Sequence, residues 1–230
     1  MPDQHRTVRT VEIKEDITSR NNAEAARIRH ALEEKGIFYL NIMSSPGSGK
    51  TTLLVSLLER LREDYRIGVI EADIDSDVDA RTIAETGVKT IQMHTAGACH
   101  ITCQMSREAL EALGLEGLDI VILENIGNLV CPAEFDTGAG KNLVLLSVPE
   151  GDDKPLKYPL MFEVASAVAV TKTDVAPAFD FSMERVRENI RRRNPGVPVF
   201  FTSALTGEGV GEVEAYIRRE ADKVNSAKRI

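Results

Sequence analysis

The chain has 230 residues, of which 43% are hydrophobic and 28% charged, and its 36 acidic residues against 28 basic ones give a formal net charge of −8. Such a composition predicts one globular domain, and the acidic balance argues against a nucleic acid or an anionic membrane surface as partner. No apolar run approaches the roughly 20 residues that span a bilayer, and the charged N-terminus is unlike a secretory signal, so we expect a cytoplasmic protein.

The N-terminal part of the chain divides into an arm and a helix. Residues 1–20 are charged and largely without periodicity, which predicts an extended or poorly ordered arm. Residues 21–35 place apolar side chains at helical spacing, and Gly36 follows as a helix stop. We therefore expect the main domain to span residues 21–230, with this helix as its N-terminal extension.

Beyond Gly36, short apolar runs alternate with segments of helical spacing. The expected strands span residues 37–43, 66–72, 89–93, 119–124, 143–148, 165–171 and 197–202. The expected helices span residues 53–61, 79–85, 101–113, 183–193 and 211–224. Alternation of strands and helices predicts an α/β fold, in which helices cover both faces of a parallel sheet.

A glycine-bearing loop joins the first strand to the next helix. It reads Ser44-Ser45-Pro46-Gly47-Ser48-Gly49-Lys50-Thr51-Thr52. Strand, glycine loop, Lys-Thr and helix form the order of a phosphate-binding loop, whose backbone N–H groups and helix N-terminus bind a polyphosphate. Lys50 would reach the β- and γ-phosphates, and the Thr51 hydroxyl would ligate Mg²⁺. Ser44 stands where the usual pattern has glycine; the alternative, a plain Gly/Ser turn, does not explain the flanking strand and helix.

Carboxylates follow two of the buried strands. In a parallel sheet the ligand lies beyond the carboxyl ends of the strands, so residues at these ends are candidates for chemistry. Asp73 follows the second strand, and Glu124 closes the fourth strand after four apolar residues. Both positions suit a carboxylate near Mg²⁺. The nearby Asp77 and Asp79 also suit an ordinary helix N-cap.

Two short matches favour guanine as the base. The sixth expected strand runs into Thr171-Lys172-Thr173-Asp174, and the last one is followed by Ser203-Ala204-Leu205. The first match resembles the Asn-Lys-x-Asp guanine motif with Thr171 in place of Asn. Asp174 would accept hydrogen bonds from the guanine N1–H and amine, while the stem of Lys172 packs on the base. The second match suits a loop whose backbone contacts the guanine oxygen.

The three cysteines do not form a disulfide framework, because they are odd in number and the chain is long. Cys99 and His100 follow the third expected strand and Cys131 follows the fourth, so all three fall at one edge of the sheet. They could converge on Zn²⁺ or Ni²⁺, joined by Cys103 if a helix has begun there. The alternative is two structural cysteines and a solvent-facing histidine. Three ligands leave a tetrahedral site incomplete, so a site shared across a dimer is geometrically natural.

From about residue 21 to residue 224, the sequence resembles the HypB family of GTPases, which help insert nickel into NiFe hydrogenases. The most specific matching segments are residues 41–52, Ala98-Cys99-His100, Glu124-Asn125-Ile126-Gly127-Asn128-Leu129-Val130-Cys131-Pro132 and Glu150-Gly151-Asp152-Asp153-Lys154-Pro155.

The resemblance implies a G-protein-like P-loop GTPase that dimerises around nucleotide, with Ni²⁺ or Zn²⁺ near the interface. The implied ligands of that metal are Cys99, His100 and Cys131. The implied Mg²⁺ shell consists of Thr51, Asp73 and Glu124. With Asp79 as a switch candidate, the expected catalytic residues are Lys50, Asp73, Asp79 and Glu124. The expected nucleotide-binding residues are Gly47, Ser48, Gly49, Lys50, Thr51, Thr52, Lys172, Asp174, Ser203, Ala204 and Leu205. The implied partners are a second copy, a HypA-type nickel chaperone and the hydrogenase large subunit.

The chain departs from the family at several places, which include the N-terminus and the Cys-His segment. Many members carry a Cys-rich or His-rich N-terminus, whereas the first 20 residues here hold only His5. Members usually read Cys-His-Leu-Asp where this chain reads Cys99-His100-Ile101-Thr102.

We expect a nickel metallochaperone with slow GTP hydrolysis, since no catalytic Gln or Arg finger is evident. The alternatives are a GTPase for urease or carbon-monoxide dehydrogenase, a nucleotide-regulated binding module with structural cysteines, and, less favoured, a small-molecule kinase.

Overall fold

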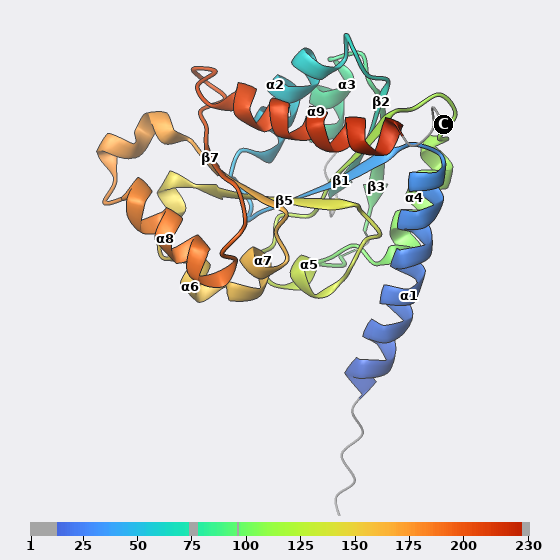
Figure 1. The fold of residues 1–230 in the computed structure, drawn as a ribbon, viewed down its shortest axis with the longest axis horizontal. Coiled ribbons are helices and arrows are strands. Elements are labelled where there is room, and N and C mark those ends of the chain that lie inside the picture. Colours follow the sequence, from blue (N-terminus) through green and yellow to red (C-terminus); the bar gives the residue numbers. More distant parts are fainter. Residues whose placement is uncertain (1–12, 74–77, 96, 227–230) are drawn as a thin grey trace, which may run out of the picture.

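A seven-stranded sheet runs through the computed structural model, which describes residues 13–73, 78–95 and 97–226 (Figure 1). The strands are β1 (Phe38–Met43), β2 (Ile67–Asp73), β3 (Lys89–His94), β4 (Ile120–Glu124), β5 (Lys141–Ser147), β6 (Ala167–Thr171) and β7 (Val199–Phe201). All neighbouring strands pair in parallel, in the order β3-β2-β4-β1-β5-β6-β7. The predicted α/β fold with a parallel sheet is confirmed.

Helices cover both faces of this sheet (Figure 1). The longer helices are α1 (Ile13–Glu34), α2 (Lys50–Leu61), α3 (Val78–Ala84), α4 (Cys103–Leu113), α8 (Met183–Arg193) and α9 (Val210–Ser226). The short ones are α5 (Cys131–Glu134), α6 (Lys154–Lys157), α7 (Pro159–Glu163) and the 3₁₀ turns η1 (Val148–Glu150) and η2 (Thr173–Ala178). One hydrophobic cluster joins α2, α3 and α9 to one face, while two others join α1 and α4, and α7 and α8, to the opposite face.

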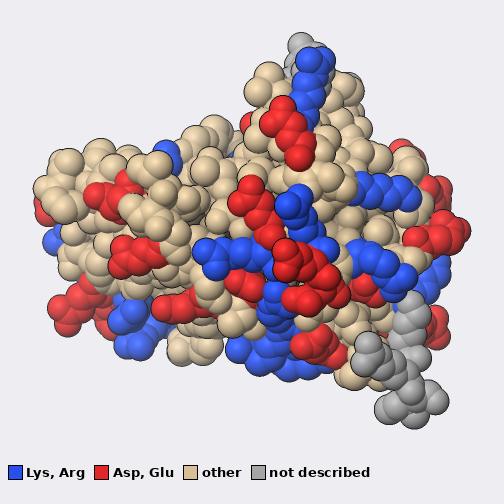
Figure 2. Space-filling model, turned by 90° about the horizontal axis from the view of Figure 1, so that it is seen from above, with Lys and Arg blue, Asp and Glu red and all other residues tan. Residues whose placement is uncertain are grey.

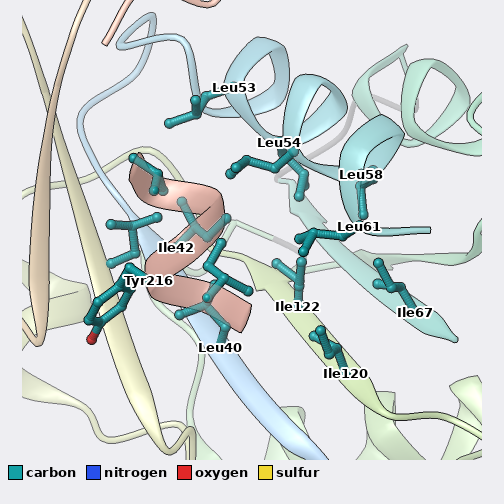
Figure 3. Close-up of a cluster of buried hydrophobic side chains, with 14 of the residues drawn as sticks. Leu40, Ile42, Leu53, Leu54, Leu58, Leu61, Ile67, Ile120, Ile122 and Tyr216 are labelled. Atoms are coloured by element: carbon teal, nitrogen blue, oxygen red, sulfur yellow. The ribbon is translucent and has the colours of Figure 1, made fainter. Parts of the chain in front are cut away.

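The core explains why the strands read as continuous apolar runs. β1 and β4 are buried along their whole length, since helices cover both of their faces. The leucines of α2 recur at helical spacing, and Figure 3 shows them packed above strand residues of the same cluster. Residues drawn there include Leu40, Ile42, Leu53, Leu54, Leu58, Leu61, Ile67, Ile120, Ile122 and Tyr216. This packing fixes the start of α2, and with it the phosphate loop, above the ends of β1 and β4.

The elements differ from the sequence prediction in some boundaries and in several short helices. α1 begins at Ile13 instead of near residue 21, so part of the expected arm is helical, and residues 1–12 lie outside the described residues. α4 begins at Cys103 and not at residue 101, because the Thr102 side chain caps it by accepting from the Met105 N–H. The helices α5 to α7 were not predicted, since four or five residues are too few to show a period.

Charged side chains of both signs are interspersed on the face seen in Figure 2. Ion pairs join α9 to α2 and to the turn after it; they include Arg60–Glu214 at 3.5 Å and Arg218–Asp64 at 2.7 Å. Among the described residues, no helix combines the length and the apolar character that crossing a membrane requires.

Candidate nucleotide and metal site

The phosphate loop lies between β1 and α2. Gly47 and Gly49 have φ angles of 71° and 91°, which other residues rarely adopt, and Gly49 directly precedes the first turn of α2. Ser44, which replaces the usual glycine, is fully buried, and its hydroxyl accepts from the Ser48 hydroxyl at 2.6 Å. The serine substitution therefore ties the two ends of the loop together.

Two buried carboxylates lie under the start of α2. Glu124 accepts a hydrogen bond from the Thr51 hydroxyl at 2.7 Å, and Glu71 lies opposite Glu124 in the register of β2 and β4. Each side chain is only 2% exposed, and each has one oxygen, Oε2, with no hydrogen-bond partner among the described residues. Orphaned buried carboxylate oxygens are what a cation or its water ligands would satisfy, so the residues fit Mg²⁺.

The electrostatics of this cluster agree with that fit. Burial, and secondly the Glu124 carboxylate, raise the pKa of Glu71 to about 8. Burial raises the pKa of Glu124 to about 7, against the lowering effects of the Thr51 hydrogen bond and the Lys50 ammonium. A bound cation would favour the ionised form of both carboxyl groups, so the cluster is built to hold positive charge.

Asp73 and Asp79 stand farther out on the same side. Asp73 ends β2 and is half-buried, while Asp79 is exposed in the first turn of α3. The charge of each also raises the pKa of both buried glutamates. The two predicted residues are therefore near the cluster, and the segment 74–77 between them lies outside the described residues.

A pocket of about 220 Å³ lies beside the phosphate loop. The lining residues are Gly49, Thr52, Leu53, Thr171, Lys172, Asp174, Val175, Thr202, Ala204 and Leu205. The Lys172 ammonium donates to the Gly47 carbonyl at 2.7 Å, so its stem runs along the loop. Thr171 donates to the Ser48 carbonyl at 2.6 Å, so threonine at this position holds the phosphate loop against the end of β6. Of the predicted base-contacting residues, Ser203 alone is buried behind the pocket, where its N–H donates to the Glu208 carbonyl.

Cys99, His100 and Cys131 come together although 30 residues lie between His100 and Cys131. One potential ligand atom from each lies within 4.8 Å of the others, and the two sulfurs are 3.0 Å apart. The His100 ring stacks on Phe135 with ring centroids 3.8 Å apart. Burial lowers the pKa of His100, which favours the neutral imidazole that binds metals. Two thiols and an imidazole form a donor set suited to Zn²⁺ or Ni²⁺.

One further cysteine and one further histidine near this edge of the sheet do not join the group. Cys103 is buried in the hydrophobic cluster between α1 and α4. Within the described part of the chain, the metal-ligand group consists of Cys99, His100 and Cys131, without Cys103. His94 is exposed at the end of β3 and is not part of that group. Cys103 therefore serves as a small apolar residue.

The phosphate loop and the metal cluster are joined by one short segment, residues 127–130. The Asn128 N–H donates to the Ser44 carbonyl at 2.8 Å, and its side-chain NH₂ donates to the Cys99 carbonyl at 3.2 Å. The Asn128 side-chain oxygen accepts from the Val130 N–H at 2.8 Å, directly before Cys131. A displacement of the phosphate loop would therefore reach both segments that carry the metal-ligand candidates.

Gly127 should be intolerant of a side chain, because it lies against the phosphate loop. A Cβ there would lie 2.9 Å from both the backbone nitrogen and the Cα of Pro46, so the loop would have to move. We expect Gly127→Ala to weaken nucleotide binding, because relief of an overpacked contact, which typically costs about 1–3 kcal/mol of stability, displaces the phosphate loop. Calorimetric titration with GDP measures this. Gly196→Ala, at an exposed position with open space around it, is the control and should bind like wild type.

Sequence reasoning missed three residues of this site. Glu71 is the one charged residue among residues 67–72 of β2, ahead of the terminal Asp73, and this was the available signal. Asn128 lies inside the segment 124–132 that resembles the HypB family, but an asparagine in that segment does not by itself indicate a catalytic or metal-binding role. Glu150 accepts from the Ser45 hydroxyl of the phosphate loop and from the Ser147 N–H and hydroxyl at 2.8 and 2.7 Å, so it links that loop to the end of β5. Nothing in the sequence indicates this contact.

Comparisons with known proteins agree with this geometry. A family model described as CobW/HypB/UreG, nucleotide-binding domain, matches residues 38–201. The hydrogenase maturation factor HypB of Azotobacter chroococcum mcd 1 is 46% identical over 92% of this chain and 70% of its own length. The hydrogenase/urease maturation factor HypB of Helicobacter hepaticus is 41% identical over 92% of this chain and 88% of its own length.

A solved structure leads to the same assignment. The crystal structure of HypB from Helicobacter pylori in complex with nickel matches with a TM-score of 0.83 and 38% identity, over 89% of this chain and 96% of that one. A phosphate loop, a carboxylate cluster and a Cys-His-Cys group thus occur in a chain that resembles these proteins over nearly all of its length. The chain belongs to the CobW/HypB/UreG family and, within it, to the HypB hydrogenase maturation factors.

Proposed function

We propose that the chain is a GTP-hydrolysing nickel metallochaperone that assists nickel insertion into a NiFe hydrogenase. The observation that carries the proposal is the Cys99–His100–Cys131 cluster, whose segments are hydrogen-bonded through Asn128 to the phosphate loop. Adjacent nucleotide and metal sites are what a metal carrier switched by a nucleotide requires. Relatives named as hydrogenase maturation factors, one of them crystallised with nickel, support the same function.

The phosphate chemistry follows from the residues around the loop. Lys50 and the backbone N–H groups of residues 47–52 would hold the β- and γ-phosphates. Thr51, with Asp73 and Glu124, would hold Mg²⁺, which supplies neutralisation of charge on the transferring phosphoryl group. Glu124 orients the Thr51 hydroxyl through their 2.7 Å hydrogen bond. Asp79 is the candidate to orient water as part of a switch, and slow hydrolysis is expected without an arginine finger.

The base is proposed to be guanine because Asp174 lines the pocket beside the phosphate loop. Asp174 is exposed, so its carboxylate is free to accept from the N1–H and the amine of the base. Ala204 and Leu205 line the same pocket, and a backbone N–H of this loop would meet the guanine oxygen.

Asp174→Asn should change the preferred base from guanine to xanthine. The amide offers one donor and one acceptor in place of two acceptors, so it mismatches guanine and suits xanthine, which presents an oxygen where guanine has its amine. We expect weaker GTP binding, by at least about tenfold, and a gain in affinity for xanthosine triphosphate. Competition between the two nucleotides measures the preference. Asp180→Asn, a fully exposed position, is the control, and an unchanged GTP preference in Asp174→Asn would place the base elsewhere.

The metal cargo is proposed to be Ni²⁺, with Zn²⁺ as a competing ion. Three ligands leave a four-coordinate site incomplete, so a homodimer that brings two clusters together is part of the proposal. A HypA-type nickel chaperone and the hydrogenase large subunit are the proposed partners, in the cytoplasm. This places the chain between a nickel donor and the enzyme that receives the metal.

Two other functions remain distinguishable by experiment. A urease or carbon-monoxide dehydrogenase could be the client instead, and one relative is itself named as a hydrogenase/urease maturation factor. A binding module with structural cysteines would hold nucleotide but no metal. The test is metal titration and GTP turnover of the purified reduced protein, followed by nickel delivery to apo-hydrogenase and apo-urease. If the protein binds metal but does not deliver it to hydrogenase, hydrogenase is not its client. If it binds nucleotide but no metal, it is a nucleotide-binding module with structural cysteines.

A further inference from the structure

The N-terminal helix α1 contacts both chain segments that carry the metal ligands. One segment runs from Cys99 into α4, and the other runs from Cys131 through α5 to Asp136. These segments are far apart in sequence, and each lies in a connection between a strand and the element after it. Their relative position therefore depends on contacts outside the ligands themselves.

A single side chain of α1, that of Asn21, bridges the two segments. Its NH₂ group donates to the Asp136 carbonyl at 2.8 Å, and its oxygen accepts from the Cys103 N–H at 3.0 Å. Asn21 is only 8% exposed, so both backbone groups depend on it and not on bulk water. An amide suits this place because it offers a donor and an acceptor at once.

The bridge continues to the ligands on both sides. The Arg29 guanidinium of α1 holds the Asp136 carboxylate with two hydrogen bonds of 2.7 and 2.9 Å, and its Nε donates to the Ala139 carbonyl at 3.0 Å. Phe135, directly before Asp136, stacks flat on the His100 ring at 3.8 Å. Fixing Asp136 thus fixes the surface that orients His100, while fixing Cys103 holds the segment that leads from His100 into α4.

We infer that Asn21 is a positioning residue of the metal centre, through which α1 sets the distance between the Cys99–His100 segment and the Cys131 segment. The inference rests on the proposed function only in taking these three residues as the metal ligands. Loss of the bridge separates the ligand segments without removing a ligand. Outer contacts of this kind typically change metal affinity by about 10- to 100-fold when removed.

The test compares Asn21→Ala with Asn22→Ala, its exposed neighbour on the same helix. Metal-free, reduced full-length protein is titrated with Ni²⁺, and the thiolate-to-nickel absorption bands and the GDP affinity are recorded for each variant. We expect Asn21→Ala to bind Ni²⁺ about 10- to 100-fold more weakly with shifted bands and unchanged GDP affinity. Asn22→Ala should match wild type. Asn21→Asp keeps the acceptor for the Cys103 N–H but faces the Asp136 carbonyl with an oxygen, so it should not restore the affinity.

Arg29→Met provides a second variant if Asn21→Ala fails to fold. It removes the hydrogen bonds to Asp136 and Ala139 from a half-buried side chain, and a weaker effect in the same direction is expected. Wild-type affinity and bands in a folded Asn21→Ala protein, or in Arg29→Met where that is the variant that folds, would overturn the inference while leaving the metal centre in place. Failure of wild type to bind Ni²⁺ would instead overturn the proposed metal centre, and the positioning role with it.

Discussion

Lys50→Ala should abolish GTP hydrolysis and weaken nucleotide binding. Lys50 begins α2, and its ammonium lies close enough to Glu71 and Glu124 to lower the pKa of both carboxyl groups. In the nucleotide complex this charge would pair with the β- and γ-phosphates. A charge-assisted hydrogen bond contributes about 1.5–3 kcal/mol, which predicts a loss of at least about tenfold in GDP and GTP affinity. Charge stabilisation in the transition state adds a further loss of at least about 100-fold in turnover.

The measurement is single-turnover hydrolysis at saturating GTP, combined with nucleotide titration. Lys35→Ala serves as the control, because Lys35 is an exposed lysine between α1 and β1. It precedes the amino end of β1, whereas the phosphate loop follows the carboxyl end of that strand. Removal of Lys50 also takes away a positive charge that lowers the pKa of both Glu71 and Glu124, so thermal stability should be compared for both variants. Hydrolysis by Lys50→Ala at the wild-type rate would contradict the assignment of the phosphate loop.

The order of the elements was predictable because the sheet is parallel and covered on both faces. A strand such as β4 must then be apolar on both sides, which gives the unbroken run Ile120-Val121-Ile122-Leu123. The amphipathic α2 shows its leucines at helical spacing for the same reason. Elements of four or five residues, such as α5, carry no period, and they were missed although α5 begins at a metal-ligand candidate.

The candidate site was predictable where one rule places residues at the carboxyl ends of strands. That rule brings together Glu124, Cys99 and Cys131, which the chain order separates. The rule does not say which of the cysteines near a strand end joins the metal-ligand group. Cys103 is one helical turn from Cys99 yet points into the core, because α4 begins at Cys103 and packs on α1.

Residues that act through contacts were outside the reach of the sequence. Asn21 and Asn128 each satisfy backbone groups of two separate segments, and asparagine at such positions looks like any polar surface residue in a single sequence. Glu71 could be suspected as a charge in an apolar run, but its partner Glu124 follows only from the β2–β4 register. Register depends on the packing of the whole sheet and not on local pattern.

Cys131→Ala should remove most of the metal affinity. It leaves Cys99 and His100 as the only described members of the cluster, and loss of a direct ligand should exceed the roughly 10- to 100-fold cost of changing an outer contact. Binding of the metal displaces the thiol protons, so affinity should also fall as pH is lowered. The measurement is competition with a chromophoric chelator on reduced protein. Cys103→Ala removes a thiol that lies outside the cluster, and it should bind like wild type; equal affinity in Cys131→Ala would show that Cys131 is structural.

The same titration in two nucleotide states tests whether the metal site is switched. Asn128 joins the Ser44 carbonyl of the phosphate loop to the Cys99 carbonyl and to Val130, so a γ-phosphate that shifts the loop should move Cys131 relative to Cys99. Metal affinity of wild type with GDP and with a non-hydrolysable GTP analogue should therefore differ, typically by about 5- to 150-fold for such couplings. Linkage requires the metal to change the ratio of the two nucleotide affinities by the same factor, which gives an independent check. Equal metal affinity in both states would leave a metal site but remove the switch that a metallochaperone needs.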